Sequence, residues 1–334
     1  MYKIRQPSSP VVNVVLGQTA THELNRGPRF HDLTYAVTIT KTGLTAGAAF
    51  QPLVADALDL ITVLVNDSEK RVHTATELDA VQTRWTPNLA IVKFDQVGND
   101  LITAVADVVN ATGGVVNGVP ANSTVRTTTF LVVVNFAEPS RSTFADREKF
   151  AWPTAWASGR TAKVVVKLKL PANAGVTAPV VTCQESIDYV LGPVINGNDT
   201  MPITAWVRQE EVYAGLKPVI RKWSFTGLLQ QVSIFSPTDQ PDYVAKLKVK
   251  LGTAIIWDAA KGDADYICDR NQWNVNGKAA GRYDFAADYS DNPGDAVNID
   301  GSTLFELALT LTQAASANKT LVLLNQVYQD ALSQ

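Results

Sequence analysis

The chain has 334 residues, of which 46% are hydrophobic and 18% charged, and its formal net charge is −3 at pH 7. This length is enough for two domains of ordinary size with a large apolar core. The near-neutral balance excludes a broad basic face for nucleic acid, and no run of about 18 apolar residues is present to span a bilayer.

The first ten residues (MYKIRQPSSP) lack the apolar segment of a signal peptide. We therefore expect synthesis in the cytoplasm and reduced thiols. Lys3 and Arg5 give this segment positive charge. Such a segment could lie along a neighbouring chain or reach anionic lipid, and a frayed terminus is the simpler alternative.

Strand patterns dominate the first half of the chain. Residues 31–40 alternate, with apolar side chains on one face and polar ones on the other, which is typical of a half-buried strand. Residues 58–65 form a Leu/Ile/Val run that ends at Asn66-Asp67-Ser68, a predicted turn. Residues 11–16 and 125–136 also favour strands.

Two short helices are predicted in the same half. Thr74 and Glu77 have the spacing of a capping box, which predicts a helix over residues 75–85. A second helix is predicted over residues 100–110, before Gly113-Gly114.

Two segments alternate lysine with aliphatic residues. They are residues 163–170 (KVVVKLKL) and residues 244–251 (VAKLKVKL). The simplest interpretation is a solvated strand face whose charge discourages edge pairing, and phosphate binding is the weaker alternative. Because one such strand lies near the end of the first half and the other lies inside the second half, we predict two β domains in series, residues 1–172 and 173–334, with a linker at residues 171–175.

The second half repeats the strand pattern. Predicted strands cover residues 180–191, 219–226, 232–235, 243–257, 303–312 and 320–328, separated by loops rich in Gly, Asn, Asp and Pro. About eight strands in each half, few helices and no βαβ alternation predict an all-β protein. The expected fold is two tandem eight-stranded jelly-roll β-sandwiches with a few short helices in loops.

Signals for catalysis are weak. The three histidines, His22, His31 and His73, form no HxH or HExxH pattern, and neither a GxSxG nor a Walker sequence occurs. Cys183 and Cys268 are far apart and form no CxxC. We expect two free thiols, although the sequence leaves a disulfide open.

The loop at residues 284–300 is the most notable polar cluster. Asp288, Asp291 and Asp295 are candidate calcium ligands because calcium prefers several converging oxygen atoms. The spacing is not that of an EF-hand, and a solvated loop that uses Asp, Asn and Pro for turns is the favoured alternative. No other cofactor is expected.

The seven tryptophans allow a different function. Trp152 and Trp156 lie in the segment FAWPTAW, and indole rings stacked on an exposed face would bind sugars. Packing in a core or an interface is the stronger expectation for tryptophan. A carbohydrate-binding β-sandwich, either a spike or a lectin, is therefore the alternative function.

Short sequence pieces carry a resemblance to a known family. The N-terminal half has ELNRG at residues 23–27, FHDL at residues 30–33, the turn at Asn66-Asp67 and then Glu77-Leu78. The C-terminal half adds CQESIDY at residues 183–189, DYICD at residues 265–269 and two final strands. In this order of elements the chain resembles the double jelly-roll major capsid proteins of tail-less icosahedral viruses, especially bacteriophages with an internal membrane.

The resemblance implies a structural virion protein and no enzyme. Its partners would be copies of itself in a homotrimer with a pseudo-hexagonal outline, then neighbouring capsomers, penton and minor capsid proteins. It would also imply contact with viral membrane lipid through the N-terminus, no specific nucleic acid, and a location in the virion capsid after synthesis in the host cytoplasm.

Overall fold

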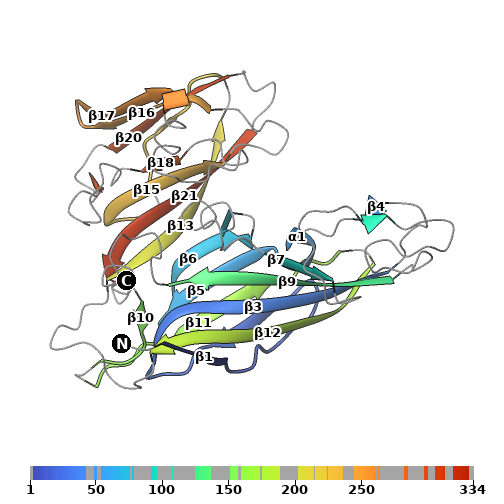
Figure 1. The fold of residues 1–334 in the computed structure, drawn as a ribbon. Helices are drawn as coiled ribbons and strands as arrows, with labels where there is room; N and C mark the ends of the chain where they lie inside the picture. The colour runs from blue at the N-terminus through green and yellow to red at the C-terminus, as the bar shows by residue number, and fades with distance from the viewer. Residues whose placement is uncertain are drawn as a thin grey trace.

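We analysed a computed structural model of the chain. It describes residues 3–42, 49–50, 54–75, 77–78, 92–95, 107–108, 125–136, 151–156, 159–173, 175–188, 202–213, 215–223, 225–235, 244–260, 262–263, 282–284, 297–299, 305–312 and 319–330. The described chain forms two β-sandwich lobes, one above the other in the view of Figure 1.

The first lobe contains two sheets that face each other. One has the order β12 (Val176–Asp188), β3 (Arg29–Thr42), β9 (Val125–Asn135) and β7 (Val92–Asp95), extended by β1 (Lys3–Pro7) beside β12 and by β10 (Trp152–Pro153) beside β3. The other has the order β6 (Ser68–Thr74), β5 (Leu60–Val65), β11 (Val164–Lys169) and β2 (Thr19–Glu23).

The core of this lobe follows the predicted alternation. Leu33, Tyr35 and Val37 of β3 are completely buried, as are Val164 and Val166 of β11. These side chains pack in one apolar cluster between the two sheets. Burial of apolar surface contributes about 25 cal/mol per Å², so this shared core is the main stabilising contact between the sheets.

The second lobe repeats the arrangement of two facing sheets. One has the order β18 (Arg282–Asp284), β15 (Leu228–Phe235), β21 (Lys319–Asp330) and β13 (Pro202–Tyr213), with β19 (Val297–Asn298) beside β15. The other has the order β14 (Val219–Ile220), β20 (Phe305–Leu311), β16 (Val244–Leu251) and β17 (Ala254–Ala260). Leu247, Val249, Leu307, Leu309 and Leu323 are among the residues of a separate core cluster.

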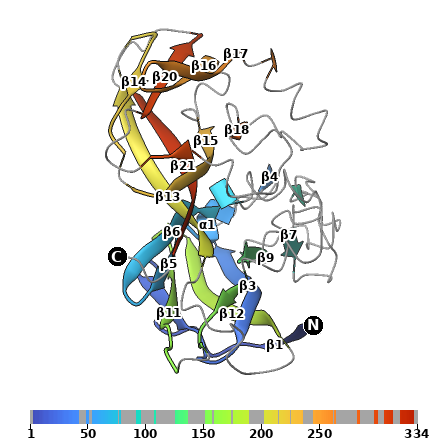
Figure 2. The same ribbon diagram turned by 90° about the vertical axis from the view of Figure 1, so that its left-hand side faces the viewer.

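One sheet runs through both lobes. The pairing of β13 with β6 is parallel and joins one sheet of each lobe into a single nine-stranded sheet, with Trp206 opposite Arg71. Figure 2 shows the resulting path from β11 through β5, β6 and β13 to β21 and β15. The remaining elements are small: α1 (Val54–Ala57), β4 (Ala49–Phe50) and β8 (Asp107–Val108). Among the described helical segments, none has the length and apolar character needed to cross a membrane.

The two sandwiches do not divide at residue 172. β12 begins after that point, but it pairs with β1 and β3, and its residues Val181, Cys183 and Ile187 belong to the first core. The segment 171–175 therefore connects β11 and β12 within the first lobe, and the change of lobe falls between Asp188 and Pro202. Residues 183–189, which we assign from the sequence to the C-terminal half, include the end of β12, the last strand of the first lobe.

Local predictions have mixed outcomes. The turn at Asn66-Asp67 is confirmed, with φ values of 47° and 65° that suit a two-residue hairpin. The capping box is confirmed, since Thr74 Oγ1 accepts a hydrogen bond from the Glu77 amide and Glu77 Oε2 accepts one from the Thr74 amide. Residues 75, 77 and 78 are helical, and residues 79–85 lie outside the described residues.

Other predicted elements differ from the structure. Of residues 100–110, the described part is a short strand, β8, instead of a helix. Residues 11–16 contribute only a single bridge from Val12 to Thr21, and the strand predicted over 219–226 is limited to Val219–Ile220. The long strand β13 was not predicted at all.

The β5–β6 turn gives a direct stability test. Both turn residues adopt left-handed backbone conformations, which favour glycine. Asn66 also accepts a hydrogen bond from the Lys163 amide through Oδ1, so it should be kept. We expect Asp67→Gly to raise the free energy of unfolding by up to about 1 kcal/mol, because relief of backbone strain outweighs the added entropy of the unfolded chain. Chemical denaturation would measure this, and Asp67→Ala, which keeps the strain, should give no gain.

Candidate functional site: the junction between the two lobes

The junction is centred on the side chain of Arg71, which is 1% exposed. Its Cζ atom lies 4.8 Å from the ring centroid of Trp206, 4.9 Å from that of Trp152 and 5.4 Å from that of Phe136. A guanidinium over aromatic faces is stabilised by about 0.5–2 kcal/mol for each ring. The cation is therefore enclosed by aromatic rings from both lobes.

Hydrogen bonds fix the orientation of this guanidinium. Arg71 Nε donates to the carbonyl oxygen of Thr204 on β13 at 3.1 Å, and Nη1 donates to the carbonyl oxygen of Asn135 at the end of β9. One side chain on β6 thus contacts a strand of the second lobe and the facing sheet of its own lobe. This arrangement compensates for the removal of a charge from water.

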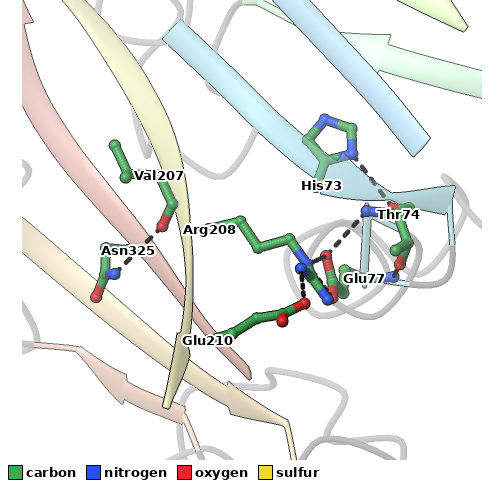
Figure 3. A network of polar contacts seen from close by, with 7 residues as sticks. All are labelled: His73, Thr74, Glu77, Val207, Arg208, Glu210 and Asn325. Atoms are coloured by element: carbon green, nitrogen blue, oxygen red, sulfur yellow. Dashed lines mark hydrogen bonds and ion pairs between the residues drawn. The ribbon is translucent and has the colours of Figure 1, made fainter. Parts of the chain in front are cut away.

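A second contact between the lobes lies four residues beyond Thr204 along β13. Arg208 Nε donates to Glu77 Oε1 at 3.0 Å, and Glu77 is also the carboxylate of the capping box. Arg208 also pairs with Glu210 on its own strand. Figure 3 shows how the Glu77 carboxylate lies between the Thr74 amide and Arg208. Because Glu77 is only 6% exposed, this ion pair is shielded from solvent on one side.

His73 completes the junction on the β6 side. Its ring lies 5.2 Å from that of Trp206, and Nδ1 is 3.2 Å from the carbonyl oxygen of Thr74. Burial lowers the pKa of His73 to about 3, against the hydrogen bond to Thr74, and the charge of Arg71 lowers it further. His73 is therefore neutral at pH 7, and Nδ1 carries the proton that it donates to Thr74.

A different polar cluster closes one edge of the first sandwich. His22 of β2 lies between Tyr35 of the facing sheet, whose hydroxyl is 2.8 Å from Nδ1, and Ser8, whose Oγ is 3.0 Å from Nε2. Ser8 Oγ donates to Glu185 Oε2 at 2.5 Å, and Gln6 Nε2 donates to the other carboxylate oxygen at 2.8 Å. The cluster links the N-terminal segment to both sheets.

The direction of these hydrogen bonds argues against nucleophilic catalysis. Ser8 gives its one hydroxyl proton to Glu185, so His22 Nε2 must donate to Ser8 and cannot act as its base. His22 is completely buried, and burial lowers its pKa to about 4, against the opposing effect of a hydrogen bond that the ring donates to the backbone of Ser9. The serine–histidine–glutamate group is therefore a structural clasp.

His31 lies in a third place. Its Nε2 is 2.7 Å from Asp188 Oδ1, and Arg29 Nε donates to the other oxygen at 2.8 Å. Burial raises the pKa of Asp188, but the hydrogen bonds from His31 and Arg29 outweigh it and hold the pKa below its usual value. The three histidines thus occupy separate clusters. In the described residues, no group of three or more His, Cys, Asp or Glu side chains could hold a metal ion.

The proposed calcium ligands remain untested. Asp288, Asp291 and Asp295 lie outside the described residues. Cys183 is a buried free thiol whose pKa is raised by burial, and Cys268 lies outside the described residues.

The two aromatic residues that could have bound sugar are internal. Trp152 is 0% exposed and Trp156 is 2% exposed, so core packing is confirmed for both. The alternative in which Trp152 and Trp156 stack on sugars from an exposed face is therefore wrong.

The lysine faces of both lobes are solvated, as expected. Lys246 and Lys248 contact Asp258 at 2.7 and 3.4 Å, and Lys250 contacts Glu306 at 3.1 Å. In the first lobe, Lys169 contacts Asp59 at 2.7 Å. Several lysines on these strands are therefore paired with neighbouring carboxylates.

Comparisons of the sequence alone found no relatives. No protein-family model matches the chain. No curated protein matches its sequence either.

Comparison of the structure gives full-length matches. The major capsid protein P2 of bacteriophage PM2 matches with a TM-score of 0.65 and 12% identity over 100% of both chains. The major capsid protein of STIV matches with a TM-score of 0.68 and 10% identity over 98% of this chain and 97% of that one. The PBCV-1 virus capsid protein matches with a TM-score of 0.60 and 12% identity, over 98% and 93%. The chain therefore has the double jelly-roll fold.

The importance of Arg71 can be tested by truncation. We expect Arg71→Ala to lower the free energy of unfolding by about 3–5 kcal/mol, because it leaves a void and two buried carbonyl groups without their donor. Urea denaturation would measure the loss. Arg221→Ala is the matched control, since Arg221 is 71% exposed and its ion pair with Glu306 should contribute far less. Equal losses in the two variants would contradict the central role of Arg71.

Stability should also depend on pH through the buried histidines. The pKa of His22 is lowered to about 4 and that of His73 to about 3, so the unfolded chain binds more protons below pH 6.5. The contribution of these two histidines to the free energy of unfolding is fully present above pH 6.5. It is lost progressively as the pH falls toward 4. His22 alone contributes about 3 kcal/mol to this loss. Unfolding measured between pH 4 and 7 should show a shallower slope for His22→Gln, and an unchanged slope would contradict this origin.

Proposed function

We propose that the protein is a major capsid subunit of an icosahedral virus with an internal membrane, and that its work is assembly instead of catalysis. The observation that carries the proposal is the pair of β-sandwiches, which are joined by one continuous sheet and matched over 98–100% of the chain by three viral capsid proteins. The buried tryptophans and the clasp at Ser8 speak against the sugar-binding and hydrolytic alternatives.

The rigid junction suits a building block of a shell. Two similar sandwiches in fixed relation give one subunit two similar side faces, so that a trimer would present a pseudo-hexagonal outline. Exposed apolar side chains are present on both lobes, including Val12 at 52%, Val180 at 53%, Val212 at 65% and Ile255 at 56%. Obligate interfaces bury more than about 2,000 Å² and are largely apolar, and such residues fit that use.

Further partners follow from the same proposal. Neighbouring capsomers, penton and minor capsid proteins would contact the outer faces of the trimer. The N-terminus would contact membrane lipid through Lys3, although Lys3–Pro7 pairs with β12 and Arg5 contacts Asp32 at 3.1 Å, which restrains this segment. Synthesis in the host cytoplasm also belongs to the proposal, whereas Asp288, Asp291 and Asp295 stay candidate calcium ligands with a solvated loop as the favoured alternative. No specific nucleic acid is expected.

The oligomeric state tests the proposal directly. Size-exclusion chromatography with light scattering should give three times the mass of one chain, and electron microscopy of the purified protein should show pseudo-hexagonal particles or arrays. A monomer that binds glycans would overturn the proposal.

A surface variant makes the test sharper. Val212→Lys should leave the melting temperature of the fold unchanged, because the side chain is exposed, but it should weaken trimers if this part of β13 is covered by another copy. Thr226→Lys is a control at an exposed polar position of the same lobe. Unchanged trimers in the Val212 variant would exclude this surface from the interface.

A further inference from the structure

The long sheet contains a buried amide without a hydrogen-bond partner. Gln326 of β21 is 0% exposed, and neither its Nε2 nor its Oε1 has a partner. Two nearby side chains share this property: Trp206 is 4% exposed with an unpaired Nε1, and Gln230 is 5% exposed with an unpaired Oε1. Buried polar groups in proteins are nearly always paired with protein or with ordered water, so this group needs an explanation.

The strand register places these three side chains together. Trp206 lies directly opposite Gln326 across the β13–β21 pair, so both project from the same face of the sheet. On the other side, Leu229 opposes Val327 and Gln231 opposes Gln326, which leaves Gln230 as the extra residue of a β-bulge. Leu229 and Val232 both face the second core. Gln230, the extra residue between them, therefore projects from the opposite face, which is the face of Gln326.

His73 extends the group across the junction. Its ring contacts that of Trp206 at 5.2 Å, it is completely buried, and its Nε2 has no partner. Since Nδ1 donates to the Thr74 carbonyl, Nε2 is an acceptor. The set then holds donors at Trp206 Nε1 and Gln326 Nε2, and acceptors at His73 Nε2, Gln326 Oε1 and Gln230 Oε1.

This mixture identifies the ligand by its chemistry. An anion would need donors only, and a cation would need acceptors only and would be repelled by Arg71, which lies 4.8 Å from the Trp206 ring. A neutral molecule that both donates and accepts satisfies the whole set. We infer that this face of the β13–β21–β15 sheet, next to Arg71, binds an internal cluster of ordered water molecules that bridges Trp206, Gln230 and Gln326 and extends to His73.

The inferred site has a consequence for the junction. Internal water typically makes about three hydrogen bonds to groups that would otherwise be unsatisfied, and it is costly to remove. The lobes would then be joined by direct hydrogen bonds from Arg71 and Arg208 and, beside them, by water-mediated hydrogen bonds. This inference does not depend on the proposed function.

A density map of the wild-type protein at about 2 Å resolution or better decides the matter. We expect separate density within hydrogen-bonding distance, about 2.7–3.2 Å, of the Gln326 amide and of Trp206 Nε1. Direct hydrogen bonds among these side chains, with no density between them, would overturn the inference.

Thermal unfolding of a near-isosteric variant gives a second test. Gln326→Met removes both polar atoms while it keeps the length of the side chain. If the amide binds water, the variant loses those hydrogen bonds and its Tm should fall by at least about 2 °C. An unchanged or higher Tm would show that the amide was dry and would contradict the inference. Gln18→Met, at an exposed position, is the control and should leave the Tm unchanged.

Discussion

The fold depends on how one buried cation joins two sheets. The described backbone contact between the lobes' sheets is the parallel pair of β6 and β13, and a short parallel pair gives little stability by itself. Arg71 reinforces it because its guanidinium replaces hydration with two carbonyl acceptors and three aromatic faces. Leu324 and Trp206 of the second lobe belong to the first apolar core. The lobes are therefore continuous in packing as well as in hydrogen bonding.

The edges of the first sandwich show a related use of polar groups. The N-terminal segment pairs with β12 as β1, and Ser8 then connects Glu185 of one sheet to His22 of the other. Val12 bridges Thr21 on the edge strand β2. These contacts cover strand edges that would otherwise attract other chains without order. Disordered edge-to-edge pairing through these strands is thereby disfavoured.

Much of the fold was predictable because burial on one face imposes a period of two. The strands around residues 33–39 and 164–170, the turn at Asn66-Asp67 and the capping box all follow from local chemistry. β13 escaped prediction because Ile203, Ala205 and Trp206 are buried without alternation and a polar run follows. The assignment of β12 to the second domain was also wrong, because the order of strands along the chain does not determine which sheet a strand joins. Its partners β1 and β3 are far away in sequence.

The junction itself could not be found from the sequence for the same reason. Arg71 stands in a strand with Glu69 and Lys70, where a charged residue normally indicates solvent, and its aromatic partners come from distant segments. An apolar junction would hold the lobes together, but parallel strands with apolar contacts alone can slide by two residues at little cost. Directional contacts remove that freedom, since only one register places Thr204 opposite the Arg71 donor and Arg208 within reach of Glu77. The proposed shell subunit would require a fixed relative placement of its two sandwiches, and the buried polar contacts supply that placement.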